Sequence, residues 1–400
     1  DYSIIPSKYK RNMISRIKMI AGMNIMETRL PQDGAIKSKI GERFLDLRVS
    51  SLPTNNAEKI VIRILDYSMS LAGLDNLGFS EDAMEKINRL IKIPNGIILV
   101  TGATGTGKST TLYSILQKLN TEEVNIITVE DPVEMDIEGI NQVQTQSEIG
   151  LTFATILRSI LRQDPNIIMI GEIRDDETAR IAVRASITGH LVLSSLHTNN
   201  SLNTIERLTD MDVERYLLGS SLEGIISQRL ARKVCPECSI KRPTTDYERQ
   251  VFKTVLGKDV LEMVVANKEG CPKCTHGYKG RLAILEVLVM NEKIKDAITN
   301  GANKNTLREL VYTGDVVTLL QDGLNKVVLG ETTFEEILKI VDLENDMTQY
   351  NDDNLKTNLI MAQQAHKADN KTNDKPITSN ISSEFKIEKT NNENIETVEF

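Results

Sequence analysis

Hydrophobic positions near the start of the chain follow two different periods. Apolar residues between 13 and 21 recur at helical spacing, which predicts an amphipathic helix. Residues 30–34 are then predicted to form a turn, because this segment contains Pro and Gly. Polar and apolar residues alternate over 43–50, and 60–65 is rich in β-branched residues, so both segments are predicted strands. Together these elements predict a small α+β domain.

Further along, hydrophobic residues come in short runs that are apolar on both faces. Strands of a parallel sheet covered on both sides have this pattern. Helix-compatible stretches separate the runs, and a helix over 80–90 precedes the first of them. This succession predicts an α/β unit with a mainly parallel sheet. The runs are Gly96–Thr101, Asn125–Val129, Asn166–Ile170 and Leu191–Leu196.

These patterns also suggest where the parts of the chain begin and end. We expect an N-terminal α+β domain over residues 1–66, a linker over 67–76 and the α/β domain over 77–342. Residues 235–274 form a cysteine-bounded insert in the second domain, and helices are expected from there to its end. Residues 343–400 are rich in Asn, Lys, Thr and acids and poor in large apolar residues, which predicts a disordered polar tail.

The net charge of the chain is concentrated in this tail. Residues 341–400 carry −6 of the total of −8, which leaves −2 for the rest of the chain. Proteins that bind nucleic acid nonspecifically usually present a broad basic field, and this composition provides none. The chain also lacks Trp, and its few aromatic residues offer little surface for base stacking. No nucleic-acid partner is therefore expected.

Several observations bear on the compartment. No run approaches the ~18 consecutive apolar residues of a membrane helix, and no signal peptide is recognisable near the start. The four cysteines fall in two close pairs, which without an export signal favours metal binding over disulfides. We therefore expect a cytoplasmic protein. Because the chain begins at Asp1 rather than at Met, we allow for a region upstream of it.

Residues 102–109 carry the most specific motif, a full match to G-x-x-x-x-G-K-[ST] between a predicted strand and a helix-compatible segment. Its glycines let backbone N–H groups curl around a phosphate at a helix N-terminus, which favours anions. Lys108 is expected to reach the β- and γ-phosphates of ATP, and the Ser109 hydroxyl to ligate Mg²⁺. The predicted nucleotide-binding residues are Gly102, Ala103, Thr104, Gly105, Thr106, Gly107, Lys108, Ser109 and Thr110.

Hydrolysis needs acids in addition to a phosphate loop, because metal must be held and water oriented. Two candidates follow predicted strands, where doubly wound sheets place their chemistry. Glu130 begins the segment Glu130–Glu134, and Glu172 comes directly after Gly171. Each could equally be a surface acid at a strand end, and the pattern alone leaves both interpretations open.

Two C-x-x-C pairs bound the insert, and thirty-two residues separate them. Four thiolates converging on one tetrahedral ion favour Zn²⁺. Such a site has no open position for water, so its predicted role is structural. Few large apolar residues lie between the pairs, so metal is expected to supply much of the folding energy of the insert. The alternative is four reduced cysteines without metal. The residues are Cys235, Cys238, Cys271 and Cys274.

In chain order, these segments resemble the secretion ATPases, the motors of type II secretion and type IV pilus assembly. The phosphate loop, 127–134, 171–175 and 188–199 are similar to the Walker A, Asp, Walker B and His boxes of that family. The resemblance spans roughly residues 10–342. It also includes the cysteine pairs, Arg29–Gly34, Asp46–Ser50, Ser227–Leu230, Leu319–Val327 and Gly330–Thr333.

This resemblance implies a fold and roles for single residues. The fold would be a RecA-like P-loop ATPase core with a PAS-like N-terminal domain and a Cys₄ zinc insert. Glu172 would activate the attacking water, and Glu130 would help to organise Mg²⁺ and water. His190 and His197 would form the His-box pair, which couples the γ-phosphate region to the sheet.

The resemblance also implies an assembly. Family members act as homohexamers on an inner-membrane platform protein, from the cytoplasmic face, with ATP, Mg²⁺ and Zn²⁺ as ligands. Arg48 and Arg63 would approach the nucleotide across a domain or subunit boundary, as arginine fingers do. The cysteine pairs favour an assembly or secretion motor over a pilus-retraction motor. The choice between pilus assembly and type II secretion stays open.

Three features depart from the family pattern, and the sequence leaves two alternatives to a motor ATPase. The additional N-terminal domain that docks family members on the membrane machinery is not recognisable, residues 311–317 are less apolar than expected, and the Asn-rich tail has no counterpart. One alternative is a nucleic-acid translocase or helicase, because ring P-loop motors of that class share this core. The near-neutral charge of this chain outside its tail argues against it. The other is a non-hydrolysing scaffold, against which the intact Lys108, Ser109, Glu130 and Glu172 argue.

Overall fold

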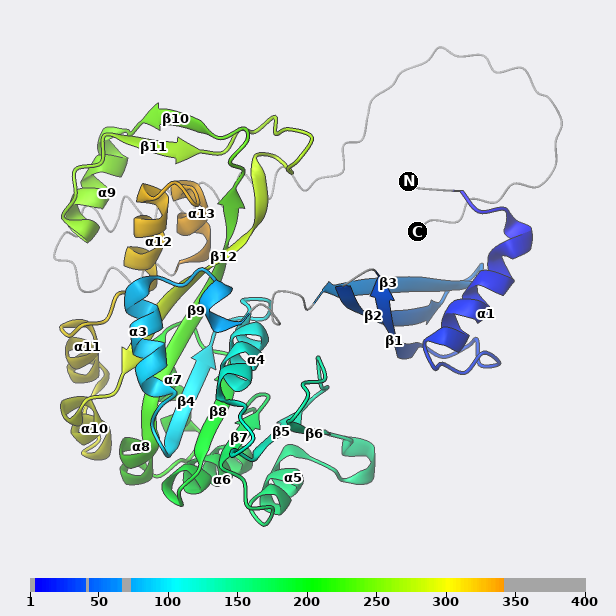
Figure 1. Ribbon diagram of the computed structural model, residues 1–400, viewed down its shortest axis with the longest axis horizontal. Coiled ribbons are helices and arrows are strands. Elements are labelled where there is room, and N and C mark those ends of the chain that lie inside the picture. Colours follow the sequence, from blue (N-terminus) through cyan, green and yellow to red (C-terminus); the bar gives the residue numbers. More distant parts are fainter. Residues whose placement is uncertain (1–3, 41–42, 67–72, 342–400) are drawn as a thin grey trace. The chain divides into compact units, whose positions relative to one another are not determined.

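The computed structural model describes residues 4–40, 43–66 and 73–341 (Figure 1). The chain divides into two compact units, whose described parts end at residue 66 and begin at residue 73. The predicted tail over 343–400 lies outside the described residues, as does the predicted linker up to residue 72. Within the described ranges, no helix combines the length and the apolar character needed to cross a bilayer.

The first unit is a three-stranded antiparallel sheet with one main helix. A 3-10 turn (Ser7–Tyr9) leads into α1 (Lys10–Ile20), and three strands follow in the spatial order β1-β2-β3. A small core of Ala21, Met23 and Val49 joins the end of the helix to the sheet. The helix and two of the strands lie where the two hydrophobic periods predict them. The strands are β1 (Gln32–Ile40), β2 (Arg43–Pro53) and β3 (Glu58–Asp66).

The turn predicted over 30–34 is wrong in its second half, because β1 already begins at Gln32. Gly34 therefore lies in a strand. A Cβ at this position would lie 2.3 Å from the carbonyl oxygen of Ala21, which is too close for any side chain. Gly34 thus permits a close backbone approach between β1 and the end of α1, and does not mark a chain reversal.

The second unit is built on a seven-stranded sheet with the order β12-β9-β4-β8-β7-β5-β6 (Figure 1). The four predicted apolar runs form its buried centre, and the predicted mainly parallel sheet is confirmed. Only β12 runs antiparallel, and it pairs with β9. The strands are β4 (Gly96–Thr101), β5 (Ile126–Glu130), β6 (Asn141–Gln144), β7 (Ile167–Ile170), β8 (Leu191–Leu196), β9 (Leu222–Val234) and β12 (Tyr278–Val289).

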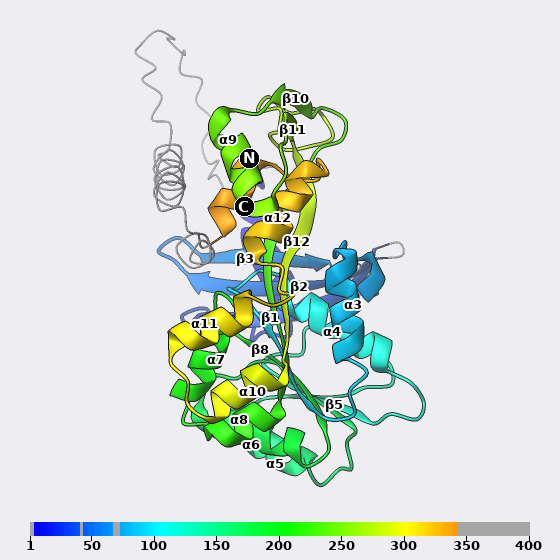
Figure 2. The same cartoon turned by 90° about the vertical axis from the view of Figure 1, so that its left-hand side faces the viewer.

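Helices cover both faces of this sheet (Figure 2). On β4, Ile98 and Val100 face the core beneath α3 (Glu81–Leu90) and α4 (Lys108–Leu119), whereas Ile97 and Leu99 face the opposite core. This alternation explains why the strand is apolar at every position. The second face is covered by α5 (Phe153–Ile160), α6 (Asp176–Ile187), α7 (Ser201–Asp210), α8 (Arg215–Ser221), α10 (Glu292–Thr299) and α11 (Lys304–Tyr312).

The expectation that helices follow the insert directly is wrong, because the long strand β12 comes first. Residues 282–288 of β12 are all buried and, apart from Glu286, all apolar, so this segment resembles the four predicted strands. Its backbone also forms one edge of the sheet. That edge is what α12 (Leu319–Val328) covers.

Two charged side chains of α12 pair with backbone groups at the outer edge of β12. The N–H of Leu285 donates to Oδ2 of Asp322 at 2.9 Å, and the ammonium of Lys326 donates to the carbonyl oxygen of Ala283. Asp322 and Lys326 are both buried and also form an ion pair at 3.1 Å. A buried ion pair therefore takes the place of a further strand at this edge.

A third core joins the insert to the C-terminal helices. α9 (Asp246–Leu256) and the hairpin of β10 (Ile240–Pro243) and β11 (Glu262–Val265) lie beside α12 and α13 (Phe334–Ile340) in both ribbon views (Figures 1 and 2). The rings of Phe252 and Phe334 pack with their centroids 5.7 Å apart. The insert therefore shares its core with α12 and α13. A metal would have to stabilise only the two cysteine knuckles, which is less than the sequence suggested.

Candidate nucleotide site and cysteine cluster

The predicted site residues follow neighbouring strands at one edge of the sheet. The phosphate loop follows β4, His197 follows β8, Glu172 follows β7, and Glu130 is the last residue of β5. These strands are adjacent and parallel, so their carboxyl ends meet at the same edge. This is the edge at which doubly wound sheets bind ligands.

The phosphate loop requires glycine at three positions. Gly102, Gly105 and Gly107 have φ angles of 152°, 79° and 89°, which other residues rarely adopt. Space is limiting as well: a Cβ at Gly102 would lie 2.6 Å from the carbonyl oxygen of Gln228. A Cβ at Gly107 would lie 2.7 Å from Nε2 of the same residue. The loop is therefore held closely against β9, and it leads into α4 at Lys108.

The side chain of Lys108 lies along this loop. Its Nζ donates to the carbonyl oxygens of Gly102 at 2.9 Å and Ala103 at 3.1 Å. Burial lowers the pKa of the Lys108 ammonium, and the negative charge of Glu172 opposes that shift. Lys108 and Glu172 therefore lie within electrostatic range of each other, as expected for residues of one phosphate site.

Glu172 is fixed between two strands. The Ser195 hydroxyl of β8 donates to the carbonyl oxygen of Gly171 at 2.7 Å, and the Ser195 carbonyl accepts the N–H of Ile173 at 3.1 Å. Oε2 of Glu172 lies 3.0 Å from Nε2 of His197, and Oε1 accepts a hydrogen bond from Arg174. The structure thus brings Glu172 and His197 together beside the phosphate loop.

Arg174 is a site residue to which the sequence reasoning gave no role. Besides its contact with Glu172, its Nη1 donates to Oδ2 of Asp131 at 3.1 Å. The guanidinium therefore bridges the acids that follow β7 and β5. Arg174 and Asp131 both belong to recognisable motifs, but only the pairing of β5 with β7 shows that they meet.

Glu130 lies deeper than Glu172, with 3% of its surface exposed. Its Oε2 accepts the hydroxyl of Tyr113, and its Oε1 accepts Thr128 Oγ1 at 2.5 Å and Gln142 Nε2 at 3.1 Å. Burial, and then the charge of Glu130, raise the pKa of Tyr113, so its hydroxyl stays protonated as a donor. The acid predicted to organise metal and water is therefore held by three neutral donors.

The remaining predicted residues lie elsewhere. His190 precedes β8, at the opposite end of the strand from His197, and its Nδ1 lies 2.9 Å from the carbonyl oxygen of Ala185. Of the predicted His pair, only His197 therefore reaches Glu172. Arg48 and Arg63 belong to the first unit, where β2 and β3 place their Cα atoms opposite each other. Their side chains thus share one face of that sheet, and their role at a nucleotide stays a prediction.

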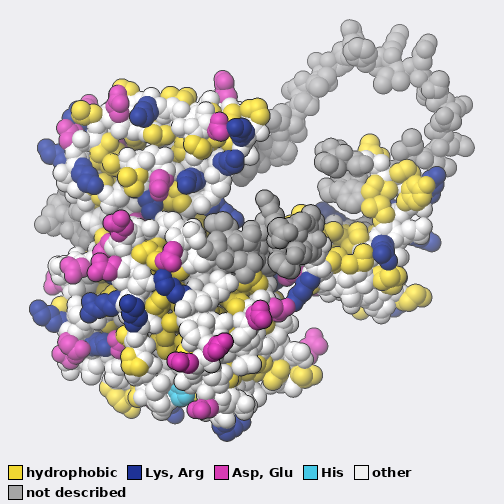
Figure 3. Space-filling model, viewed as in Figure 1, with side chains coloured by type: hydrophobic (Ala, Val, Ile, Leu, Met, Phe, Trp, Pro, Cys, Tyr) yellow, Lys and Arg dark blue, Asp and Glu magenta, His cyan; other side chains and the backbone are white. Residues whose placement is uncertain are grey.

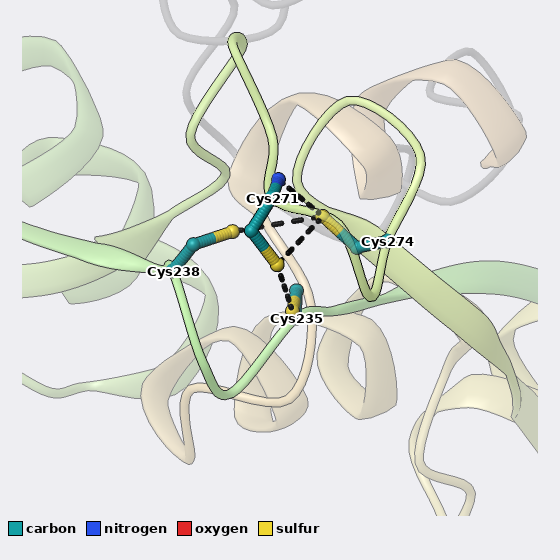
Figure 4. A group of neighbouring side chains, drawn as sticks. All are labelled: Cys235, Cys238, Cys271 and Cys274. Atoms are coloured by element: carbon teal, nitrogen blue, oxygen red, sulfur yellow. Dashed lines mark hydrogen bonds between the residues drawn. The ribbon is translucent and has the colours of Figure 1, made fainter.

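The four cysteines converge from two loops (Figure 4). Cys235 and Cys238 follow β9, whereas Cys271 and Cys274 precede β12, and the pairing of these strands brings the two knuckles together. The Sγ atoms of Cys235 and Cys271 are 3.8 Å apart, those of Cys238 and Cys274 are 3.6 Å apart, and all four lie within 4.8 Å of one another. A tetrahedral zinc ion with sulfur at ~2.3 Å places its ligands ~3.8 Å apart. The cluster has the donors and the spacing for one such ion.

A mainly parallel sheet that carries a glycine-rich phosphate loop, and an acid at the same edge two strands away, defines a P-loop nucleotide-binding protein. Comparison with known families narrows this class. The family described as Type II/IV secretion system protein matches residues 4–339. The chain belongs to this family.

Curated relatives come from type II secretion systems. The chain is 47% identical over 329 residues to a putative type II secretion system protein E of Escherichia coli K12, covering 82% of this chain and 66% of that protein. It is 45% identical over 329 residues to the type II secretion system ATPase E of Vibrio cholerae, covering 82% and 65%. The chain thus spans slightly less than two thirds of the length of these relatives.

Solved structures share the fold. The pilus retraction motor PilT with bound ADP superimposes with a TM-score of 0.57 at 26% identity, covering 85% of this chain and 82% of that one. The ATPase DotB of Legionella pneumophila has a TM-score of 0.55 at 22% identity, with coverage of 77% and 76%. At that identity, the second likeness concerns the fold alone.

Proposed function

We propose that this chain hydrolyses ATP as a subunit of a homohexameric motor at the cytoplasmic face of the inner membrane. One observation carries the proposal: Glu172 stands at the carboxyl end of β7, in electrostatic range of Lys108 and 3.0 Å from His197. A carboxylate beside the phosphate loop can accept a proton from water that attacks the γ-phosphate. The relatives named as secretion proteins support this reading.

In this proposal, residues 102–110 bind the phosphates through backbone N–H groups, and Lys108 exchanges its two carbonyl partners for phosphate oxygens. The Ser109 hydroxyl, in the first turn of α4, would hold Mg²⁺, which offsets phosphate charge. His197 and Arg174 orient the Glu172 carboxylate through its two oxygens. Glu130 stabilises the same edge of the sheet, because Tyr113, Thr128 and Gln142 all donate to its carboxylate.

Arg48 and Arg63 are proposed to supply positive charge to the phosphates, within one chain or between subunits. Their Cα atoms are direct partners in the antiparallel pair of β2 and β3. Two guanidinium groups on one face of a sheet can donate hydrogen bonds to the same phosphate, which supports a role in binding phosphate.

The cysteine cluster is proposed to hold one structural Zn²⁺ with Cys235, Cys238, Cys271 and Cys274 as its ligands.

The resemblance to the secretion ATPases supports the finer fold assignments, which are a RecA-like core in the second unit and a PAS-like first unit. The platform protein of the inner membrane is the proposed docking partner. The type II secretion relatives, at 44–47% identity, favour pseudopilus assembly in type II secretion over type IV pilus assembly.

A nucleic-acid translocase is disfavoured by the distribution of charge. On the face of the second unit seen in Figure 3, basic and acidic side chains are interspersed, and no extended basic field is visible there. Binding to a phosphodiester backbone relies on such a field. A non-hydrolysing scaffold is disfavoured by the placement of Glu172 against His197.

The test is phosphate release from ATP by the purified chain with Mg²⁺, alongside nucleotide binding. Lys108→Ala is expected to weaken binding and to abolish turnover, because Lys108 contacts phosphate before reaction. Glu172→Gln is expected to bind ATP normally and to lose turnover, because Glu172 acts on water. Near-normal turnover in Glu172→Gln would contradict the assignment of the base. Absence of turnover in the parent chain, in rings shown to be assembled, would contradict the proposal itself.

A further inference from the structure

Arg229 is a buried charge directly behind the phosphate loop. β9 pairs with β4 so that Ser227 lies beside Thr101, and β9 then continues along the loop that follows β4. The Arg229 residue is 9% exposed. A Cβ at Gly102 would lie 3.3 Å from its Nη1, so the guanidinium stands against the first residue of the phosphate loop.

The other end of the guanidinium holds a different loop of the site. Its Nη2 donates to the carbonyl oxygen of Asn199 at 2.9 Å and to Oδ1 of the same residue at 3.1 Å. Its Nη1 donates to the carbonyl oxygen of Gln228 at 3.0 Å. Asn199 comes two residues after His197, the residue that contacts Glu172. The side chain of Arg229 thus lies against both the phosphate loop and the loop that carries His197.

The charge of Arg229 also acts on two nearby charged groups. Burial raises the pKa of Glu286 on β12, and the positive charge of Arg229 opposes that shift. Burial is the main reason that the pKa of Lys108 is lowered, and the charge of Arg229 adds to that effect, which places the two cations near each other.

We propose that Arg229 is a positioning residue that fixes Asn199, and through it His197, so that Glu172 is aimed at the phosphate loop. The inference rests on the proposed function, because it presupposes that Glu172 acts on water. Arg174, in contrast, reaches Glu172 from an exposed position, with 57% of its side chain accessible. Arg229 is held from several sides, which suits a residue that sets geometry.

The first experiment separates positioning from binding. Arg229→Gln is expected to lower kcat by roughly 10- to 100-fold, the range that misplacement of a catalytic group produces. The Kd for a fluorescent ATP analogue is expected to change by less than about 3-fold, because Arg229 makes its contacts to the protein. Arg249→Gln changes a partly exposed arginine of α9 that pairs with Asp259, so it is the matched control and should leave turnover unchanged.

The second experiment asks whether Arg229 acts through His197. In a His197→Ala background, Arg229→Gln is expected to lower kcat by less than about 2-fold, because the residue it positions is already missing. Asn199→Ala removes an exposed side chain and one of the two contacts, so it should fold normally and show a smaller loss of kcat with the same non-additivity. It carries the test if thermal unfolding shows that Arg229→Gln is misfolded.

Two results would overturn the inference. One is a loss of affinity as large as the loss of kcat/KM in Arg229→Gln, which would assign the residue to nucleotide binding. The other is a full effect of Arg229→Gln or Asn199→Ala in the His197→Ala background. Both require a parent chain that turns over ATP, so they are distinct from failure of the proposed function, in which the parent has no turnover.

Discussion

The hydroxyl of Tyr113 donates to the carboxylate of Glu130 and so closes the end of β5 beneath helix α4. The same hydroxyl accepts the backbone N–H of Glu134 at 3.0 Å. Tyr113 therefore ties two ends of the segment 130–134 to the helix that begins at Lys108. The contacts of Glu130 therefore contribute to the stability of the fold more than those of Glu172, the other acid of the site.

Glu130→Gln is therefore expected to cost stability. The amide has one acceptor oxygen for the three donors Tyr113, Thr128 and Gln142, and its own NH₂ group is turned towards one of them. Leaving a buried donor unsatisfied costs about 1–3 kcal/mol. Thermal unfolding should show a clearly lower Tm for Glu130→Gln, whereas Glu172→Gln, at the partly open edge, should unfold near the parent Tm. Equal Tm values for both variants would contradict the structural role of Glu130.

The arginine pair of the first unit can be tested by mixing subunits. If Arg48 or Arg63 serves the nucleotide of a neighbouring subunit, a ring of Arg63→Ala and Lys108→Ala subunits contains some sites with both residues intact. Mixed rings should then recover part of the turnover that either variant lacks alone, and an Arg48→Ala mixture should behave alike. No recovery in rings proven to be mixed would mean that the arginines act within their own chain or have no role in turnover.

The cysteine cluster predicts about one Zn²⁺ per chain in protein purified under reducing conditions, the content of a single Cys₄ site. Replacing Cys235 and Cys238 by Ser should remove the metal and open the two knuckles to protease. Because Phe252 and its neighbours pack on α12 and α13, helix α9 should stay protected. Elemental analysis together with limited proteolysis measures both effects.

ATP binding is the internal control for the cysteine variant. The phosphate loop follows β4 and contacts β9 at Gln228 and its neighbours, well before Cys235, so binding should persist when the metal is lost. Absence of zinc from reduced protein would refute the metal site. Cleavage within α9 as fast as within the knuckles would instead show that the metal stabilises the whole insert.

Glu286 predicts a pH dependence of stability. Its carboxyl group lies on β12 with 0% exposure; Oε1 accepts the N–H of Ser201 at 2.9 Å, and Oε2 has no partner among the described residues. Burial raises the pKa of Glu286. Above the pKa of the unfolded chain, about 4.3, the folded state then retains a proton that the unfolded state has lost. Stability is therefore lost as pH rises towards the folded pKa.

Glu286→Gln removes this titration while its amide oxygen can still accept the Ser201 N–H. The difference in Tm between Glu286→Gln and the parent should accordingly grow in favour of the variant as pH rises from about 4.5 towards 8. Thermal unfolding at several pH values provides the measurement. A difference that shrinks with rising pH would show that the protein stabilises the ionised form.

Local signals in the sequence account for a large part of the sheet and the phosphate loop. The four predicted apolar runs are confirmed as β4, β5, β7 and β8. They are recognisable because a strand buried on both faces gives a continuous apolar run. β12 is apolar at six of the seven positions 282–288, but Glu286 interrupts the run and a polar insert precedes it, so the pattern does not predict a strand there. Gly34 was misassigned because a glycine needed for close backbone approach looks the same in sequence as one needed for a turn.

The contacts of the site depend on which strands are neighbours, and sequence does not state that order. Glu172 meets His197 because β7 pairs with β8, and Arg229 reaches Asn199 because β9 lies beside β4. The separation of His190 from His197, in contrast, follows from strand length. The six residues of β8 lie between them, and a strand rises ~3.3 Å per residue. Strand length alone therefore places the two imidazoles far apart.

The cover that Asp322 and Lys326 place over β12 has a consequence for solubility and assembly. A strand edge with free N–H and C=O groups is a template on which another chain can form cross-β contacts. The opposite edge of the described seven-stranded sheet is β6, which is only four residues long. In the proposed ring, subunits would then meet through surfaces other than the β12 edge. The buried ion pair of α12 thus blocks the pairing of β12 with a strand of a neighbouring molecule, and so opposes edge-to-edge association into fibres.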